Sequence, residues 1–435
     1  MLVRMNYGRM GLTLTLPDDW RVDVLNKKAM PILSDPSHAV AEALSAPVGC
    51  RPLREEARAG KSACVLVCDI TRPVPNGLLL APIIRELMAG GMMPENIRVV
   101  VATGLHRPNE DRELAELIGD GWVLRTVKVE NHFARNDEDH VYLSLTNRQT
   151  PIKIDKRFVE ADLKIVTGLV EPHFMAGYSG GRKVIVPGIA HEDTIRRLHT
   201  ASFLEHPGSA NCVLEGNPLH EEMLEAIDLL GGAMAINTVI TDRRELSFVN
   251  FGEIKQSHLK AVEFARPFAE VFLPQSYQTV ITSNAGYPLD KTYYQTIKGM
   301  VGALDALTPG GGDIFIVSRL SEGLGSPDYR QAQERLIELG EDAFLKEIEP
   351  KKQAAIDEWE TEMQLKVTRK GRVHLFTQGL TLDEERLTGI EVFSDLAEFT
   401  QAIARSGFME KRALVIPEGP YILPFIKNNQ PGSSH

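Results

Sequence analysis

Residues 63–91 read ACVLVCDITRPVPNGLLLAPIIRELMAGG, and this stretch decides the fold class. The apolar run Ala63–Ile70 is typical of a buried strand, and the pattern of Leu79–Ala89 predicts a helix that ends at Gly90-Gly91. Between them lies a polar, proline-rich segment. A buried strand followed by a loop and a helix is the unit from which parallel sheets are built, so the stretch indicates an α/β domain.

The same alternation of strands and helices continues along the chain in two series. The predicted strands are Ile97–Ala102, Val123–Val129 and Asp162–Val170 in the first series and Gln278–Thr282, Asp313–Ser318, Val373–Thr377 and Ala413–Ile416 in the second, with helices over Thr292–Leu307 and Asp395–Ala404. We therefore predict two α/β domains with mainly parallel sheets, over residues 1–270 and 271–435, with a linker near 265–276. Alternating leucines and valines over residues 12–24 predict a small set of antiparallel strands at the start of the chain.

The composition limits the classes of function. The 435 residues are 43% hydrophobic and 25% charged, as in an ordinary globular protein. A formal net charge of −11 argues against a protein that coats nucleic acid or an anionic membrane, but it allows a local basic pocket for a small anion. Four cysteines make no disulfide framework in a chain this long, and the first residues lack the apolar core of a secretion signal. We therefore expect a cytoplasmic location.

Four predicted strands end in polar segments of unusual chemistry. These segments are DITRPVPN (69–76), TGLHRP (103–108), TGLVEPHFMAGYSGGRK (167–183) and TSNAGYPLD (282–290). Ligands of open α/β sheets bind beyond the carboxyl ends of strands, so we expect the four segments to line one cleft. Turn formation explains the Gly, Pro and Asn residues, but it does not require the cationic and imidazole side chains of Arg72, His106, His173 and Lys183.

The glycine-rich segment GYSGGRKVIVPG (177–188) is a candidate anion site. Glycines let backbone N–H groups approach an anionic cofactor group closely, and neighbouring cations add charge; the candidate residues are Gly177, Ser179, Gly180, Gly181, Arg182 and Lys183. The spacing differs from a Walker A loop, and no G-x-G-x-x-G follows a strand, so a dinucleotide site is poorly supported. The alternative is a glycine-rich turn that binds nothing.

Three histidines are candidates for chemistry. His106 and His173 each follow a strand end, where an imidazole with a pKa near ~6.5 suits proton transfer in either direction. His199 lies on a predicted helix in HEDTIRRLHT, and spacing alone leaves a single metal ligand and a solvated helix histidine equally open.

The helix TYYQTIKGMVGAL (292–304) carries a polar trio. Tyr294 and Lys298 share one face, and Gln295 neighbours Lys298 at the i+3 position. Together with Arg72, Lys298 could hold a carboxylate between the two domains. A solvated amphipathic face is the alternative.

These motifs resemble those of a known family. DITRPVPN, TGLHRP, EPHFMAGYSGGRKVIVPGIA, the LHT around His199 and YYQTIK are similar, in order and from about residue 10 to 425, to motifs of the nickel-dependent lactate racemases. Members of that family racemise or epimerise 2-hydroxy acids with a nickel-pincer nucleotide. The resemblance implies two α/β domains with the active site in the cleft between them.

The resemblance also implies residue roles. Lys183 would be joined covalently to the cofactor, a pyridinium-3,5-bisthiocarboxylic acid mononucleotide that carries nickel, and His199 would be the protein's nickel ligand. His106 and His173 would be the two acid/base residues. Asp69 and Tyr294 would line the pocket, and the substrate would be positioned by Arg72, Gln295, Lys298 and, in a looser match, Trp359.

The implied reaction is proton-coupled hydride transfer through a 2-keto acid. One histidine would remove the hydroxyl proton while hydride leaves the substrate carbon, and hydride would return to the other face with help from the second histidine. The substrate would be lactate or a related acid such as malate, and other proteins would make the cofactor. Two alternatives stay open: a cofactor-free racemase with two bases, and a non-catalytic protein that binds small anions.

Overall fold

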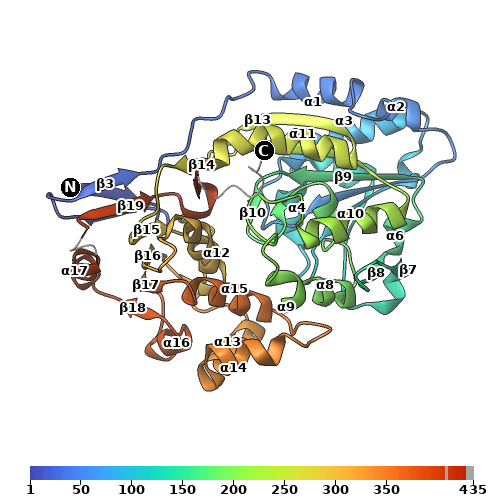
Figure 1. Cartoon of the computed structure of the whole chain (residues 1–435). Coiled ribbons are helices and arrows are strands. Elements are labelled where there is room, and N and C mark those ends of the chain that lie inside the picture. Colours follow the sequence, from blue (N-terminus) through green and yellow to red (C-terminus); the bar gives the residue numbers. More distant parts are fainter. Residues whose placement is uncertain (407–409, 428–435) are drawn as a thin grey trace, which may run out of the picture. The chain divides into compact units, whose positions relative to one another are not determined.

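The computed structural model describes residues 1–406 and 410–427, and the chain divides into two compact units (Figure 1). The central unit comprises Met30–Leu198 and His206–Arg266. The terminal unit comprises Met1–Ala29, His199–Glu205 and Pro267–His435. The predicted boundary near residue 270 falls close to the break after Arg266, but the chain's first residues and a short segment around His199 belong to the other unit.

The central unit is built on a six-stranded sheet. Its strands, in spatial order, are β13 (Leu246–Glu253), β12 (Met234–Ile240), β9 (Leu163–Leu169), β4 (Ala63–Cys68), β5 (Ile97–Ala102) and β6 (Lys128–Asn131). All neighbours are parallel except β13, which runs antiparallel to β12 at one edge. Because β4 lies in the middle, nearly all its residues are buried, and this explains its unbroken apolar sequence.

Helices and two small hairpins complete the central unit. The helices are α1 (Pro36–Ser45), α2 (Leu53–Glu56), α3 (Asn76–Ala89), α4 (Asp111–Ile118), α5 (Gly121–Thr126), α6 (Lys156–Val159), α7 (Arg182–Ile185), α8 (Glu192–Leu198), α10 (Pro218–Leu230) and α11 (Ile254–Ala269). The hairpins pair β7 (His140–Leu145) with β8 (Pro151–Asp155) and β10 (Pro172–His173) with β11 (Gly177–Tyr178). Helix α3 buries Ile83, Ile84 and Leu87 in one core with Val65 and Val99 of the sheet.

The terminal unit has its own six-stranded parallel sheet. Its order is β18 (Glu391–Phe393), β17 (Arg372–Phe376), β16 (Asp313–Val317), β15 (Thr279–Ser283), β19 (Arg412–Ile416) and β3 (Arg21–Val24). Two small pairs accompany it, antiparallel β1 (Leu2–Met5) with β2 (Leu12–Thr15) and parallel β14 (Glu270–Leu273) with β20 (Leu423–Ile426). Its helices are α9 (Ala201–Leu204), α12 (Tyr293–Ala303), α13 (Pro327–Leu339), α14 (Glu341–Ile348), α15 (Glu358–Thr368), α16 (Leu382–Leu387) and α17 (Leu396–Ser406). Among the described residues, short 3-10 turns lie at Leu304–Ala306 and Gly419–Tyr421 in this unit and at Pro94–Asn96 and Asp137–Asp139 in the central unit.

The prediction of an α/β fold with mainly parallel sheets is confirmed, and the differences are local. The predicted strand over Val123–Val129 is wrong, because Asp120 accepts hydrogen bonds from Trp122 N at 2.7 Å and Val123 N at 3.4 Å and so caps helix α5. Strand β3, expected in an antiparallel start, instead pairs in parallel with β19 and so carries the N-terminus into the terminal unit. The predicted linker at 265–276 is occupied by the end of α11 and by β14.

Across the described ranges 1–406 and 410–427, no helix is long and apolar enough to cross a membrane.

Candidate functional site

Three of the four predicted loops follow neighbouring strands of the central sheet. Strands β9, β4 and β5 are adjacent and parallel, so the segments 69–76, 103–108 and 170–183 leave the same edge. The fourth segment, 282–290, follows β15 in the terminal unit. The sheet topology thus brings the segments that carry His106, His173 and Lys183 to one edge of the central sheet.

Charged groups surround the end of β4. The pKa of the Cys68 thiol is raised to about 12, first by burial and then by the charge of Asp69, while the charges of Arg72 and Lys183 act in the opposite direction. Glu171 also acts on this thiol. The charges of Asp69, Arg72, Glu171 and Lys183 therefore all act on one thiol, which locates Lys183 in the same region as Asp69 and Arg72.

Asp69 and His106 form a hydrogen-bonded pair. Nδ1 of His106 lies 2.6 Å from Oδ2 of Asp69, and Thr71 Oγ1 donates to Oδ1 of the same carboxylate at 2.6 Å. Burial raises the pKa of Asp69, but the hydrogen bond and charge of His106, the Thr71 hydroxyl and the charge of Arg72 together hold it below its usual value. An ionised Asp69 keeps a proton on His106 Nδ1, so Nε2 is the ring atom that can accept a proton. The His106 side chain is 62% exposed, so solutes can reach it.

His173 has the opposite arrangement. Its Nδ1 accepts hydrogen bonds from the backbone N–H groups of Met175 at 3.3 Å and Ala176 at 3.2 Å, and its ring stacks on Phe174. With Nδ1 used as an acceptor, the neutral ring carries its proton on Nε2. His106 and His173 therefore differ in which ring nitrogen their surroundings leave protonated.

Arg72 has a carboxylate partner that the sequence reasoning did not identify. Arg72 Nη1 forms an ion pair with Glu171 Oε1, and the side chains are 29% and 22% exposed. Glu171 stands in the quoted motif EPHF, two residues before His173, so its position was visible in the sequence. Its role as the partner of Arg72 was not visible, because the two residues are 99 positions apart and no neighbouring sequence indicates their contact.

The glycine-rich segment is held by contacts within the protein. A Cβ on Gly177 would lie 2.1 Å from the carbonyl oxygen of Val213, and a Cβ on Gly180 would lie 2.6 Å from Val170 Cγ2; both glycines have positive φ. The Gly181 N–H donates to Asn237 Oδ1 at 3.1 Å. Ser179 Oγ donates to Leu169 O at 2.7 Å. These contacts hold the segment in place, and the prediction of an anion site there stays a prediction.

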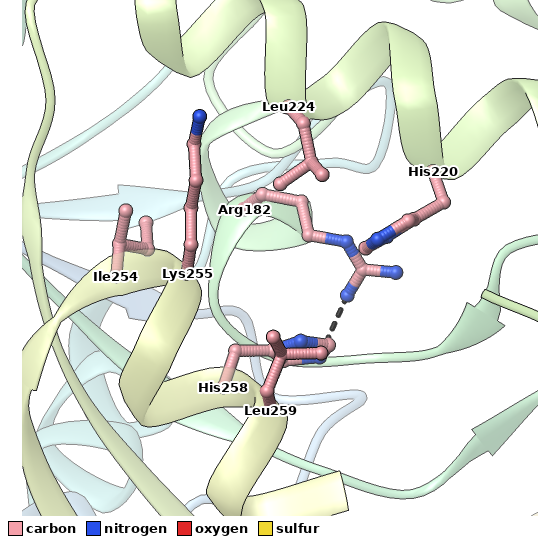
Figure 2. Close-up of a pocket in the computed structure, with 7 residues that line it drawn as sticks. All are labelled: Arg182, His220, Leu224, Ile254, Lys255, His258 and Leu259. Atoms are coloured by element: carbon pink, nitrogen blue, oxygen red, sulfur yellow. Dashed lines mark hydrogen bonds between the residues drawn. The ribbon is translucent and has the colours of Figure 1, made fainter. Parts of the chain in front are cut away.

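Arg182 is buried inside the central unit. Its guanidinium lies beside His220 of α10 and His258 of α11, and Nη1 is 2.7 Å from His258 Nε2 (Figure 2). Nη2 donates to Ala176 O at 3.0 Å. The side chain therefore ties the loop before Lys183 to α11, a role that the sequence did not suggest.

The remaining predicted residues lie in the terminal unit. On α12, Lys298 Nζ donates to Gln295 Oε1 at 2.5 Å, which confirms that these two residues are neighbours on the helix. Trp359 Nε1 on α15 donates to Tyr294 Oη at 3.1 Å. The ring of His199 packs against Trp359 with centroids 4.6 Å apart. His199 follows α8 directly, so it is not in the middle of a helix.

A buried carboxyl group, which the sequence analysis did not predict, lies beside Trp359. Glu360, next to Trp359, is 1% exposed, and burial raises its pKa to about 8, against the charge of Lys298. Its Oε1 has no hydrogen-bond partner within residues 1–406 and 410–427. The segment DEWE gave no sign that Glu360 would point into the protein, because three of its four residues are acidic.

Two protein-family models match the chain. Residues 7–211 match the lactate racemase N-terminal domain, and residues 274–423 match the lactate racemase C-terminal domain. The chain therefore belongs to the lactate racemase family, a family of isomerases.

Particular relatives agree with this assignment. The chain is 29% identical to a lactate racemase of Thermoanaerobacterium thermosaccharolyticum over 97% of its own length and 98% of the relative, and 32% identical to that of Lactiplantibacillus plantarum over 67% and 68%. The lactate racemase apoprotein structure from T. thermosaccharolyticum superposes with a TM-score of 0.88 at 28% identity, covering 98% of this chain and all of that one. A Thermotoga maritima protein, with a TM-score of 0.68 at 20% identity over 90% and 98% of the chains, shares the fold.

Proposed function

We propose that the chain is a racemase of a 2-hydroxy acid, with lactate as the first candidate substrate and malate as a related one, and that it uses a nickel-pincer nucleotide. The observation that carries the proposal is that this chain matches both lactate racemase domains. A lactate racemase also aligns with 97% of this chain. The predicted location of the site in an interdomain cleft is part of the proposal.

The donor chemistry of the chain is compatible with this cofactor. Within residues 1–406 and 410–427, no three His, Cys, Asp or Glu side chains are grouped so that they could hold a metal ion. A nickel ion held mainly by the sulfur atoms of its own cofactor needs only one imidazole from the protein, and His199 would supply it. Lys183 would carry the covalent attachment, among the charges that surround the end of β4. When bound, the group would supply the hydride acceptor and donor for the substrate carbon.

The chain's own residues would move the hydroxyl proton. His106 would accept it at Nε2, because Asp69 keeps the ring's other nitrogen protonated. His173 would donate a hydrogen bond from Nε2–H to the substrate oxygen, because two backbone N–H groups occupy its Nδ1; proton transfer from this ring would need the imidazolium form, since a neutral ring that lost its Nε2 proton would be an imidazolate. A pair that presents one acceptor and one donor suits a reaction in which the hydroxyl loses its proton on one side and regains it on the other.

The carboxylate of the substrate would be held by cations. Arg72 already pairs with one carboxylate, that of Glu171, and its planar guanidinium suits a second. Lys298, oriented by Gln295, would bind the same group, and Tyr294 with Trp359 would form a wall of the pocket. Fixing the carboxylate leaves only the hydrogen and hydroxyl of the chiral carbon to reorganise.

Two further expectations belong to the proposal. Other proteins would make and supply the cofactor, and the chain would work in the cytoplasm.

The test is a panel of enantiopure 2-hydroxy acids incubated with cofactor-loaded protein and followed by chiral chromatography. Interconversion of D- and L-lactate, or of the malate enantiomers, supports the proposal. Activity without the cofactor, with solvent deuterium at carbon 2 of the product, would instead support direct deprotonation by two bases. Binding of the acids without interconversion by fully loaded protein would leave the chain as a small-anion binder.

A further inference from the structure

A cavity beside Arg182 has the chemistry of an anion site. The cavity measures ≈ 30 Å³ and is lined by Arg182, His220, Leu224, Ile254, Lys255, His258 and Leu259. Figure 2 shows the guanidinium of Arg182 between the two imidazole rings. A buried water needs about 10–15 Å³, so the space suits about two waters or one ion of halide size.

Among the residues that the structure describes, no acidic side chain pairs with the Arg182 guanidinium in this cavity. Arg182 is 1% exposed, and its hydrogen-bond partners among the described residues are neutral: the carbonyls of Ala176 and Gly180 accept from it, and Nη1 lies 2.7 Å from His258 Nε2, which is itself 2.9 Å from Ser179 O. The lining residues include no Asp or Glu. The ammonium of Lys255 at this cavity is used in an ion pair with Asp228. A buried cation without a counter-charge is costly, so an anion in the cavity would be stabilising.

In the part of the chain that the structure describes, two buried nitrogen atoms of the side chains that line the cavity lack hydrogen-bond partners. Nε of Arg182 and Nδ1 of His220 are both buried, and neither has a hydrogen-bond partner among the described residues. The pKa of His220 is lowered to about 3, first by burial and then by the charge of Arg182, and the same causes hold the pKa of His258 well below its usual value. Both rings are thus neutral at neutral pH, and the ring of His220 can carry its single proton on Nδ1 and donate it.

We infer that this cavity binds a small inorganic monovalent anion of the size of chloride or bromide. The anion accepts hydrogen bonds from Arg182 Nε and His220 Nδ1. Because Arg182 holds the carbonyls of Ala176 and Gly180, the bound anion stabilises the loop that leads to Lys183. The site is separate from the proposed reaction, and its test needs no enzymatic activity.

The test combines crystallography with thermal unfolding of the purified full-length chain. Crystals grown in bromide are expected to give an anomalous peak within hydrogen-bond distance of Arg182 Nε and His220 Nδ1. At constant ionic strength, replacing gluconate by bromide is expected to raise Tm by about 2–4 °C and to saturate. His220→Phe keeps the ring shape but removes the donor, so the rise should shrink; Arg182→Met should abolish it, and the exposed Arg58→Met should keep it.

Three results would overturn the inference. The first is ordered water without an anomalous peak in the cavity. The second is a Tm response to bromide that is the same in the wild type, His220→Phe and Arg182→Met chains. The third is a peak without any saturable Tm response, which marks an adventitious ion only. Because His220 Nδ1 has no partner to lose, His220→Phe keeps the test decisive if Arg182→Met fails to fold.

Discussion

Nδ1 of His106 and Oδ2 of Asp69 lie 2.6 Å apart, although 37 positions separate the two residues in the chain. They meet because β4 and β5 are adjacent parallel strands, and each residue lies just beyond the carboxyl end of its strand. The pair gives an exposed imidazole a fixed tautomer, with a buried carboxylate behind it.

Asp69→Asn tests this pairing. An amide can donate to Nδ1, which would move the ring proton to Nε2 and remove the acceptor, so we expect kcat for racemisation to fall roughly 10²-fold or more. The kcat of the His106→Ala variant should fall at least as far. The control is Arg107→Gln, which changes an exposed ion pair with Glu113 next to His106. Full activity in Asp69→Asn, with an unchanged pH profile, would contradict the assigned tautomer.

The ion pair of Arg72 with Glu171 predicts opposite effects on KM. Arg72→Met removes a cation from the substrate carboxylate, so KM is expected to rise roughly 10–100-fold. Glu171→Gln removes a carboxylate that competes for Arg72, so KM should stay the same or fall. Initial rates with each lactate enantiomer give both constants. A large rise of KM in Glu171→Gln with an unchanged KM in Arg72→Met would exclude Arg72 from substrate binding.

Lys183→Ala tests the covalent attachment without an activity assay. Exposed to the cofactor-producing proteins, the wild-type chain should show an added mass by intact mass spectrometry, and Lys183→Ala should show none. Lys156→Ala is the matched control, because this lysine on α6 pairs with Asp139 and bonds Glu138 O. An added mass on Lys183→Ala equal to that of the wild type would refute the attachment site.

Two buried glutamates on α15 predict a pH-dependent stability. Burial raises the pKa of both Glu360 and Glu362 to about 8, whereas an unfolded glutamate titrates near 4.5. Between these pH values the folded chain holds protons that the unfolded chain releases, so this contribution is full below about pH 4.5 and is lost as the pH rises through 8.

This pH dependence is tested with a double variant that combines Glu360→Gln and Glu362→Gln. Its stability is measured by urea unfolding from pH 5 to 8.5. The free energy of unfolding of the double variant, relative to the wild type, is expected to increase with pH. Glu398→Gln, at an exposed position of α17, is the control and should give a difference that does not vary with pH. A pH-independent difference for the double variant would show that the two carboxyls are not protonated in the folded chain.

Local sequence patterns determined most of the fold. Runs such as Ile97–Ala102 predicted a strand with its observed ends, and Thr292 was correctly placed at the start of a helix that it caps by accepting from Gln295 N at 3.3 Å. The motifs also located His106 and His173 in the segments that follow β5 and β9, with Lys183 further along, on α7. Such patterns can be read because burial on a strand or a helix repeats with a fixed period over neighbouring residues.

Only the tertiary structure decided how these residues are used. Nothing near Arg72 in the sequence indicates Glu171, 99 positions away, and nothing near Arg182 indicates His220 or His258. The glycines of residues 177–181 suggested an anion site from composition, but packing against Val213 and Val170 accounts for two of them. Side-chain partners and the burial of charge depend on which strands and helices become neighbours, and a short stretch of sequence does not contain that information.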